Sequence, residues 1–452
     1  MPRVELRNRA VCVAAGLCCI MVAGCGSVSA ALSPSAKRVD SSRRLGRTTP
    51  APSCPRSVRG QGMIAFAARE QVDLVDLSTC RTRVLAHANT GVVRFSADGR
   101  WVGYSPSGGS GPMVVSVRGG QARAPLGAGI VDWSWARTGE LLYGLTRGGR
   151  LVSASPTGRR RVTAHLGRLN VDTGYPGLDV SPNGNQEVVD HSRCGSQAVG
   201  ELDVIDLRTG ARTVALRRPG KPVIFAGFSP NGRWLLFWPD ALCSSSLAAD
   251  GMPLKAVLAS GGQPVTAVRH TLLFRDFLSW CGGRLIAAAG SSRETQIGSR
   301  LVQTGPPAWR QRTIDPARKL SWVSPSCAPS GHTLVAAAGP NNAPVSFGHQ
   351  HRSIWLLRSN GVPVRRLTSP PAADLSDEAP RFSSDGRWIL FVRSRVVTVG
   401  RSAISKDTIE LVRTDGAGGA VPIANFTSND FSYYDHFDWP EEIDWHQSPA
   451  HG

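Results

Sequence analysis

The sequence predicts an all-β protein in which short four-stranded antiparallel sheets repeat around a closed ring. Three observations lead there: a hairpin motif that recurs along the chain, a second strand pattern between its copies, and the lack of any amphipathic helix of convincing length. Clear copies of the motif read FSADGRWV from Phe95, FSPNGRWL from Phe228 and FSSDGRWI from Phe382. Weaker copies start at positions 135, 180 and 327 and a shortened one at 280, so the starts are 40 to 55 residues apart. Such a period is typical of solenoids and propellers.

Each copy of the motif predicts a β-hairpin. An apolar strand ends, Asp-Gly or Asn-Gly supplies a tight turn, and a strand of aromatic and branched residues follows. Gly and Asn tolerate the positive φ that such turns require. We therefore interpret Asp98 and Asp385 as turn residues rather than as catalytic carboxylates.

A second strand pair follows each hairpin. Residues 72–77 run through a turn into 83–85, and residues 202–207 run through a turn into 213–216, with Cys80 standing where Gly210 supplies the second turn. Each unit then holds four short strands, which is the composition of a β-propeller blade. Eight blades are favoured, and seven is the alternative because the units near positions 180 and 280 are degenerate.

The first unit lacks its innermost strand. Residues 443–445 (Ile-Asp-Trp) are expected to supply it, with 437–439 as the less favoured choice. A C-terminal strand in the first blade closes the ring without leaving an exposed edge. The predicted propeller spans residues 61–448.

At these residues the chain resembles the TolB-like and WD-repeat-like propellers of bacteria. The copies at Phe95, Phe228 and Phe382 match the family pattern well, 354–368 matches its later strands, and Asp444-Trp445 looks like its closing strand. The resemblance covers roughly residues 62–447 and implies the fold, whereas propellers serve very different functions. Prolyl oligopeptidase-type proteases also carry propellers, but the chain has no Gly-x-Ser-x-Gly string.

The first 24 residues have the pattern of a signal peptide. A basic start precedes an apolar run at 11–22, which is too short to span a bilayer core of about 30 Å. Residues 22–25 (Val-Ala-Gly-Cys) resemble the bacterial lipobox, which implies a diacylglycerol on Cys25; an ordinary signal peptide with a chance cysteine is the alternative. Residues 25–60 predict a flexible basic tether, favourable beside an anionic lipid surface.

Six cysteines follow Cys25 without zinc-type spacing, which favours disulfides in an exported chain. Equivalent positions in the repeats lead us to pair the six as Cys54–Cys80, Cys194–Cys243 and Cys281–Cys327.

The formal net charge is +19, of which the signal peptide and the tether account for less than half. We give the basicity of the remaining chain less weight, and we expect no nucleic-acid partner for an exported protein. No cofactor and no metal are expected. His349 and His351 are interpreted as loop residues, and the acidic tail residues, among them Glu441 and Glu442, as a solvated loop beside the closing strand.

The function that these patterns favour is a lipid-anchored binding or scaffold propeller on the extracytoplasmic face of the cell membrane, recognising a protein or an envelope polymer. No catalytic motif is found, and the alternative is a lactonase-like or lyase-like enzyme acting at the central channel. The inner strands should place a mixed ring of charges there. The candidate binding residues of that ring are Arg94, Asp132, Asp179, Asp276 and Arg381.

Overall fold

A computed structural model describes residues 56–109, 111–167, 177–194, 198–239, 251–290, 298–315, 319–341, 351–399, 402–428 and 437–447. The signal peptide, Cys25 and most of the tether lie outside these residues, as do Cys54, Cys243, His349 and the tail residues 429–436. Among the described residues, no helix is both long and apolar enough to cross a membrane.

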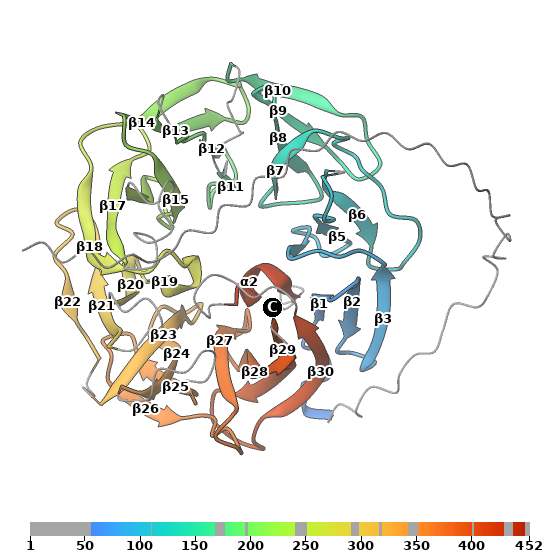
Figure 1. Ribbon diagram of the computed structural model, residues 1–452, viewed down its shortest axis with the longest axis vertical. Helices are drawn as coiled ribbons and strands as arrows, with labels where there is room; N and C mark the ends of the chain where they lie inside the picture. The colour runs from blue at the N-terminus through green and yellow to red at the C-terminus, as the bar shows by residue number, and fades with distance from the viewer. Residues whose placement is uncertain are drawn as a thin grey trace, which may run out of the picture. The chain divides into compact units, whose positions relative to one another are not determined.

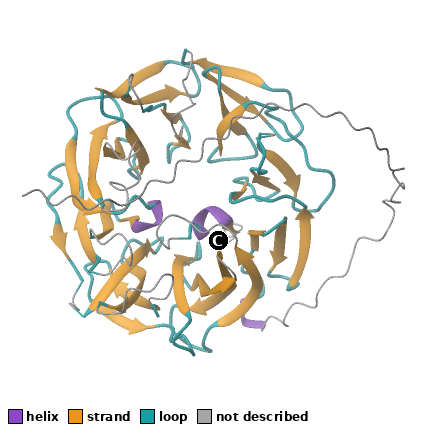
Figure 2. Ribbon diagram, viewed as in Figure 1, coloured by secondary structure: helices purple, strands orange, loops and turns teal. Residues whose placement is uncertain are grey.

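Eight antiparallel sheets follow one another around a ring, as Figure 1 shows, so the favoured blade count is confirmed. Almost all of the regular structure is strand (Figure 2). We number the blades 1 to 8 in chain order. From the inner to the outer strand, blade 1 contains β31 (Ile443–His446), β1 (Met63–Ala68), β2 (Gln71–Asp76) and β3 (Arg81–Ala86), and blade 2 contains β4 (Val93–Phe95), β5 (Trp101–Tyr104) and β6 (Met113–Ser116). Blade 3 contains β7 (Ile130–Trp135), β8 (Leu142–Thr146), β9 (Arg150–Ala154) and β10 (Arg161–His165), and blade 4 contains β11 (Gly177–Val180), β12 (Gln186–Asp190), β13 (Val199–Asp206) and β14 (Arg212–Pro219).

The remaining blades keep the same order. Blade 5 contains β15 (Val223–Phe228), β16 (Trp234–Pro239), β17 (Met252–Leu258) and β18 (Val265–Thr271), and blade 6 contains β19 (Leu278–Cys281), β20 (Arg284–Ala289), β21 (Arg300–Thr304) and β22 (Arg312–Thr313). Blade 7 contains β23 (Leu320–Cys327), β24 (Thr333–Pro340), β25 (Ser353–Arg358) and β26 (Pro363–Arg366), and blade 8 contains β27 (Ser376–Phe382), β28 (Trp388–Val399), β29 (Ser402–Arg413) and β30 (Val421–Ser428). Blade 2 has three strands, and an isolated bridge between Val114 and Arg123 stands in for the fourth. Three single turns complete the described structure: η1 (Arg56–Val58), η3 (Arg275–Phe277) and α2 (Trp439–Glu442).

The recurring motif folds into the same hydrogen-bonded turn wherever it is complete. In the first copy the buried Ser96 Oγ donates to Asp98 Oδ1 at 2.6 Å and accepts from the Trp101 N–H at 3.1 Å. The same Oδ1 accepts from the Arg100 N–H at 3.1 Å, and Gly99 has a φ of +69°. The copies that begin at Phe228 and Phe382 repeat these bonds. The Asp and Asn side chains therefore organise turns, as expected.

The closing strand is the one that the sequence favoured. β31 pairs antiparallel with β1, with Phe66 opposite Ile443 and Ile64 opposite Trp445. Ile443 is fully buried, and the Trp445 indole N–H donates to the Gln61 carbonyl at 2.7 Å. Asp438, which the alternative strand would contain, lies just before α2 instead.

The structure contains the expected Cys281–Cys327 disulfide, with Cα atoms 5.4 Å apart, between the inner strands of blades 6 and 7. Cys80 and Cys194 are also disulfide-bonded, and their expected partners lie outside the described residues. Cys80 has a φ of +59° and donates its N–H to the Asp76 carbonyl at 2.7 Å. Gly210 has a φ of +73° and bonds to the Asp206 carbonyl at 2.8 Å, so the two residues occupy equivalent turns.

Candidate functional site

The inner strands bring four of the five candidate residues into one electrostatically coupled group. Arg94 lies in β4, Asp132 in β7, Asp179 in β11 and Arg381 in β27. Arg94 interacts with the charge of Asp179, and Arg381 interacts with that of Arg94. These blades are separated along the chain, but their inner strands all face the ring axis (Figure 1).

Asp276 is placed differently from the expectation. It lies in the single turn η3 rather than in an inner strand, and it accepts a hydrogen bond from Ser324 Oγ of blade 7 at 2.7 Å. Its neighbour Arg275 interacts with the charges of Asp132 and Asp179, donates to the Phe225 carbonyl and packs 5.8 Å over the Phe225 ring. Arg275 is therefore the member of η3 that joins the charged group.

Two inner-strand aspartates connect neighbouring blades in the same way. Asp132 accepts from the N–H of Trp133 at 2.8 Å and from that of Leu178, in the next blade, at 2.7 Å. Asp444 accepts from the N–H of Trp445 at 2.9 Å and from that of Phe95, in the next blade, at 2.7 Å. Each carboxylate accepts a hydrogen bond from a backbone N–H of the next inner strand, so both residues connect neighbouring blades. Removal of either side chain would leave that N–H without its acceptor.

The tail residue Glu441 belongs to the charged group, which corrects the expectation of a solvated acidic loop for the part of the tail that is described. Its carboxylate forms an ion pair with Arg94, and the Arg94 guanidinium also donates to the carbonyls of Pro440 and Glu441 at 2.9 Å. Burial alone would lower the pKa of Arg94, but the carboxylates of Glu441 and Asp444 outweigh it and raise the pKa. Both side chains of the pair keep roughly a third of their surface exposed.

A second ion pair joins Asp179 to Arg137, which follows β7, at 3.0 Å. Burial raises the pKa of Asp179, and it raises the pKa of Asp132 to about 7. Glu187, from β12, is fully buried and accepts from Ser134 Oγ at 2.6 Å; burial raises the pKa of its carboxyl well above the ordinary range, and the charges of Asp179 and Asp132 add to this rise. Three coupled carboxyl groups therefore lie between blades 3 and 4.

A separate cluster in blade 4 has the ligand types of a metal site. His191, Glu201 and Asp203 place one ligand atom each within 4.8 Å of the others. Arg212, however, forms ion pairs at 2.6 Å with both Glu201 and Asp203, and His191 Nε2 lies 2.6 Å from Asp203. A guanidinium already balances these carboxylates, so the donor set does not fit a divalent cation.

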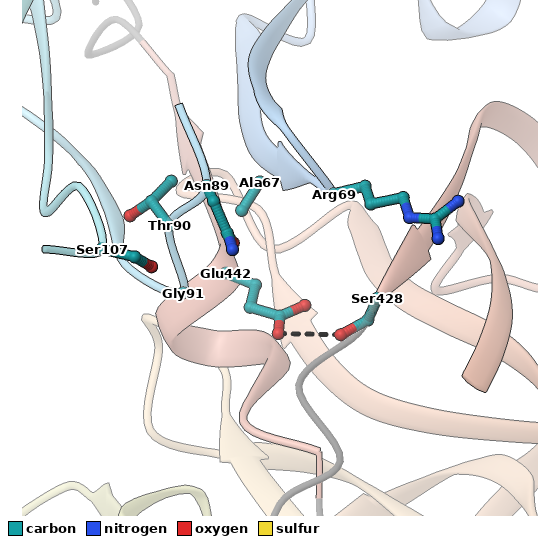
Figure 3. A pocket seen from close by; sticks show the side chains of 8 residues that line it. All are labelled: Ala67, Arg69, Asn89, Thr90, Gly91, Ser107, Ser428 and Glu442. Carbon is teal, nitrogen blue, oxygen red and sulfur yellow. Dashed lines mark hydrogen bonds between the residues drawn. The ribbon is translucent and has the colours of Figure 1, made fainter. Parts of the chain in front are cut away.

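A pocket of about 250 Å³ opens between blades 1, 2 and 8, beside the closing segment. Figure 3 shows its lining, in which Ser428 Oγ donates to the Glu442 carboxylate at 2.9 Å. The residues that line it are Ala67, Arg69, Asn89, Thr90, Gly91, Ser107, Ser428 and Glu442. Polar side chains therefore dominate this pocket.

The outer strands form what we call the arginine belt. The seven outer strands β3, β10, β14, β18, β22, β26 and β30 contain ten arginines and not one Asp or Glu. All of these arginines except the half-buried Arg218 are exposed. Sequence reasoning missed the belt, although the run Arg-Thr-Arg-Val at 81–84 and the run Arg-Thr-Val at 212–214 already show it.

Comparisons with known proteins show a likeness to solved structures in fold. Neither a protein-family model nor a curated protein sequence matches the chain. Similar solved structures include a putative TolB from Agrobacterium tumefaciens, at 12% identity over 84% of this chain and 95% of that one, with a TM-score of 0.36. An oligogalacturonate lyase from Vibrio parahaemolyticus is 11% identical over 73% of this chain and 93% of that one, with a TM-score of 0.44. The C-terminal WD40 domain of Sif2 is 12% identical over 73% of this chain and 89% of that one, with a TM-score of 0.47. At these identities the likeness concerns the fold and assigns no function.

Proposed function

We propose that this protein is a lipid-anchored binding propeller on the extracytoplasmic face of the membrane, and that it recognises an anionic polymer of the cell envelope. The observation that carries the proposal is the arginine belt, in which ten arginines stand without any acidic residue on the outer strands. Arg212 and Arg217 pair with Glu201 of the neighbouring strand β13, and the excess of positive charge that the other belt arginines leave attracts a polyanion and raises its local concentration. The lipobox-like residues 22–25 support the anchor.

The distribution of the belt favours a polymer over a flat lipid surface. The outer strands of successive blades follow one another around the periphery of the ring (Figure 1), so the strands that carry these arginines lie on many sides of the ring. A flat surface can contact only one sector of such a belt. A flexible chain of anionic units can follow it and contact several blades at once, which increases the effective concentration of each further contact.

The proposal is tested by the binding of polyphosphate to the full-length protein, with dextran as the uncharged polymer control. The triple variant Arg81→Ser, Arg83→Ser and Arg161→Ser removes belt arginines whose side chains make no ion pair within the described part of the chain. We expect affinity for polyphosphate to fall about tenfold, together with a weaker salt dependence, because fewer counterions are released on binding.

The matched control is the triple variant Arg100→Ser, Arg233→Ser and Arg387→Ser. These arginines are exposed on the hairpin turns and change the net charge by the same amount. Polyphosphate affinity should stay within about twofold of the parent protein, since these side chains lie outside the belt. Equal losses in the two triples, or equal binding of dextran and polyphosphate, would show that the belt is not a recognition surface.

The anchor is tested separately by Cys25→Ala. The variant should leave the membrane fraction or stay there only with an uncleaved signal peptide, because one lipid-modified residue is the proposed attachment. Normal maturation and unchanged partition into detergent would exclude the lipoprotein assignment.

One observation favours the enzymatic alternative. The carboxyl groups of Asp132, Asp179 and Glu187 interact electrostatically, and burial raises the pKa of each. Asp132, whose pKa burial raises to about 7, can exchange protons near neutral pH. Asp179 keeps 29% of its side chain exposed, so turnover of a lactone or an acidic polysaccharide should be lost in Asp179→Asn. Turnover that survives this change excludes this group as the catalytic site.

A further inference from the structure

The exposed apolar side chains lie on the strands of the arginine belt. Among the described residues, every large apolar side chain that is exposed belongs to a valine on an outer strand or directly before one. Their strands are β3, β10, β14, β18 and β26, which belong to five different blades. The six valines are Val84, Val162, Val214, Val265, Val362 and Val364. The belt therefore exposes apolar surface as well as positive charge.

Three of these valines occupy the same position in their blades. Val84, Val162 and Val214 each directly precede a residue at which the pairing with the neighbouring strand shifts by one, which is a β-bulge. Their exposed fractions are 44%, 49% and 44%. A belt arginine stands one or two residues before each of them. Blades 1, 3 and 4 therefore repeat one arrangement, in which an exposed valine follows an arginine.

Strand propensity alone does not explain these valines. Threonine is also β-branched and suits a strand as well, and Thr82 and Thr213 stand on the same strands. An exposed valine on an edge strand favours aggregation, which soluble proteins avoid at such edges. One exposed valine is common on a protein surface. Its repetition at one position in three blades is what indicates a ligand with apolar parts.

The edges of these strands are unsuited to a partner that adds as a further β-strand. Six of the seven outer strands pair with a register shift, which twists the edge and interrupts its ladder of hydrogen bonds. In addition, β26 and β30 contain Pro363 and Pro422, which donate no N–H. A ligand of the belt therefore contacts side chains rather than the backbone.

We propose that the polymer bound by the belt is amphiphilic, an anionic chain that carries apolar substituents along its length. This inference rests on the proposed function of the belt and narrows the class of its ligand. The anionic groups lie against the arginines, and the substituents lie on the valines and on the aliphatic stems of the arginines. Because the valines belong to separate blades, an apolar group at one end of the polymer would reach only one of them.

The test compares dextran sulfate with dextran sulfate whose remaining hydroxyl groups carry octanoyl esters, matched in chain length and in sulfate content. Octanoylated dextran without sulfate is the uncharged control. Binding to the full-length protein is measured by calorimetric titration. We expect about tenfold tighter binding of the octanoylated sulfate than of the plain sulfate, because apolar surface is buried in addition. The uncharged polymer should bind more weakly than either.

Variants assign the gain to the valines. The triple variant Val84→Thr, Val162→Thr and Val214→Thr keeps β-branched side chains of similar volume but adds hydroxyl groups, and its melting curve checks the fold. Its preference for the octanoylated sulfate should fall to about twofold or less, while its affinity for plain dextran sulfate stays within about twofold of the parent. The matched control is the triple variant Arg81→Ser, Arg83→Ser and Arg161→Ser. That variant should bind both sulfated polymers more weakly and retain the ratio between them.

The outcomes separate this inference from the proposed function. Failure of the belt to bind plain dextran sulfate and polyphosphate would remove both. Binding of these polymers through the belt arginines, without a gain from octanoylation, would overturn the inference alone. The same holds if the valine triple keeps the whole gain, or if uncharged octanoylated dextran binds as tightly as the octanoylated sulfate.

Discussion

The inner and the outer strands of the ring use charged residues in opposite ways. On the inner strands, Arg94 and Arg381 are held by Glu441 and by the Ile443 carbonyl, and Asp132 and Asp444 accept backbone N–H groups of the next blade. On the outer strands, arginines such as Arg81 stand exposed and without acidic neighbours in their strands. Charge at the axis therefore connects blades, whereas peripheral arginines such as Arg81 are left for solvent or a partner.

The largest effect should come from removing the inner strand that closes the ring. Truncation before Ile443 removes the β31 ladder, a fully buried side chain and the bond from Asp444 to Phe95. We expect a loss of at least about 3 kcal/mol in the free energy of unfolding, or aggregation through two open edges. Calorimetry and size-exclusion chromatography measure both. Unchanged melting and a monodisperse profile would mean that the closing strand contributes little.

A pair of glycine variants tests the same contact without deletion. Gly60 and Gly62 both have positive φ, but a Cβ at Gly62 would stand 2.1 Å from the His446 carbonyl oxygen, whereas one at Gly60 meets nothing within 4 Å. Both changes to Ala cost about 1–2 kcal/mol of backbone strain. Gly62→Ala should cost clearly more, because the backbone of the closing strand must shift. Equal denaturation midpoints for the two variants would contradict the tight packing of Gly62 against the closing strand.

The inter-blade carboxylates should contribute a smaller amount each. Asp444→Ala and Asp132→Ala leave the N–H groups of Phe95 and Leu178 without their acceptors, which should cost about 1–3 kcal/mol in each case. Urea denaturation measures the loss. Similar costs for the two variants would support one shared role, and a negligible cost for Asp132 alone would favour a functional role for that residue.

The pH dependence of stability should follow the inner carboxyl groups. Burial raises the pKa of Asp132 from 3.8 to about 7, so the folded protein retains a proton that the unfolded chain has released. The corresponding stabilisation is fully present below pH 3.8 and is lost as the pH rises through about 7. Melting temperature should therefore fall between pH 5 and pH 7.5, and by less in Asp132→Asn. An identical slope in the variant would contradict the raised pKa.

The smallest effect is expected on the outer strands. The triple variant of Arg81, Arg83 and Arg161 should change the free energy of unfolding by no more than about 0.5 kcal/mol per site, because these side chains are exposed and have no ion-pair partner in the described residues. Its melting curve should overlay that of the parent. A large destabilisation would mean that the belt supports the fold.

Local chemistry explains why so much of the fold could be predicted. The turn at Asp98-Gly99 depends on residues within one motif, and its repetition gives the blade period. The closing strand followed from counting: the first unit lacked an inner strand, and Ile443 to Trp445 had the pattern to supply one. Arg94 and Asp179 could be predicted to lie near the ring axis because both belong to inner strands.

The remaining parts of the site depend on contacts that no single motif encodes. Glu441 enters the charged group because α2 precedes the closing strand, and Arg137 reaches Asp179 from the hairpin turn of the previous blade. The pocket needs loops from three blades and could not be read from any one of them. The belt arginines were visible in the sequence, but the many arginines elsewhere in the chain concealed them.

The closing strand also fixes the order of folding events. The Trp445 indole and the Gln61 carbonyl that it contacts are 384 residues apart in sequence. During synthesis, which runs from the N-terminus, blade 1 must wait with an unpaired inner edge until every other blade has been made. Contacts of such long range form slowly, and unpaired edges invite wrong partners in the meantime. The nascent ring is therefore most exposed to misassociation in the interval before residues 443–446 emerge, and a chaperone that covers β1 would act in that interval.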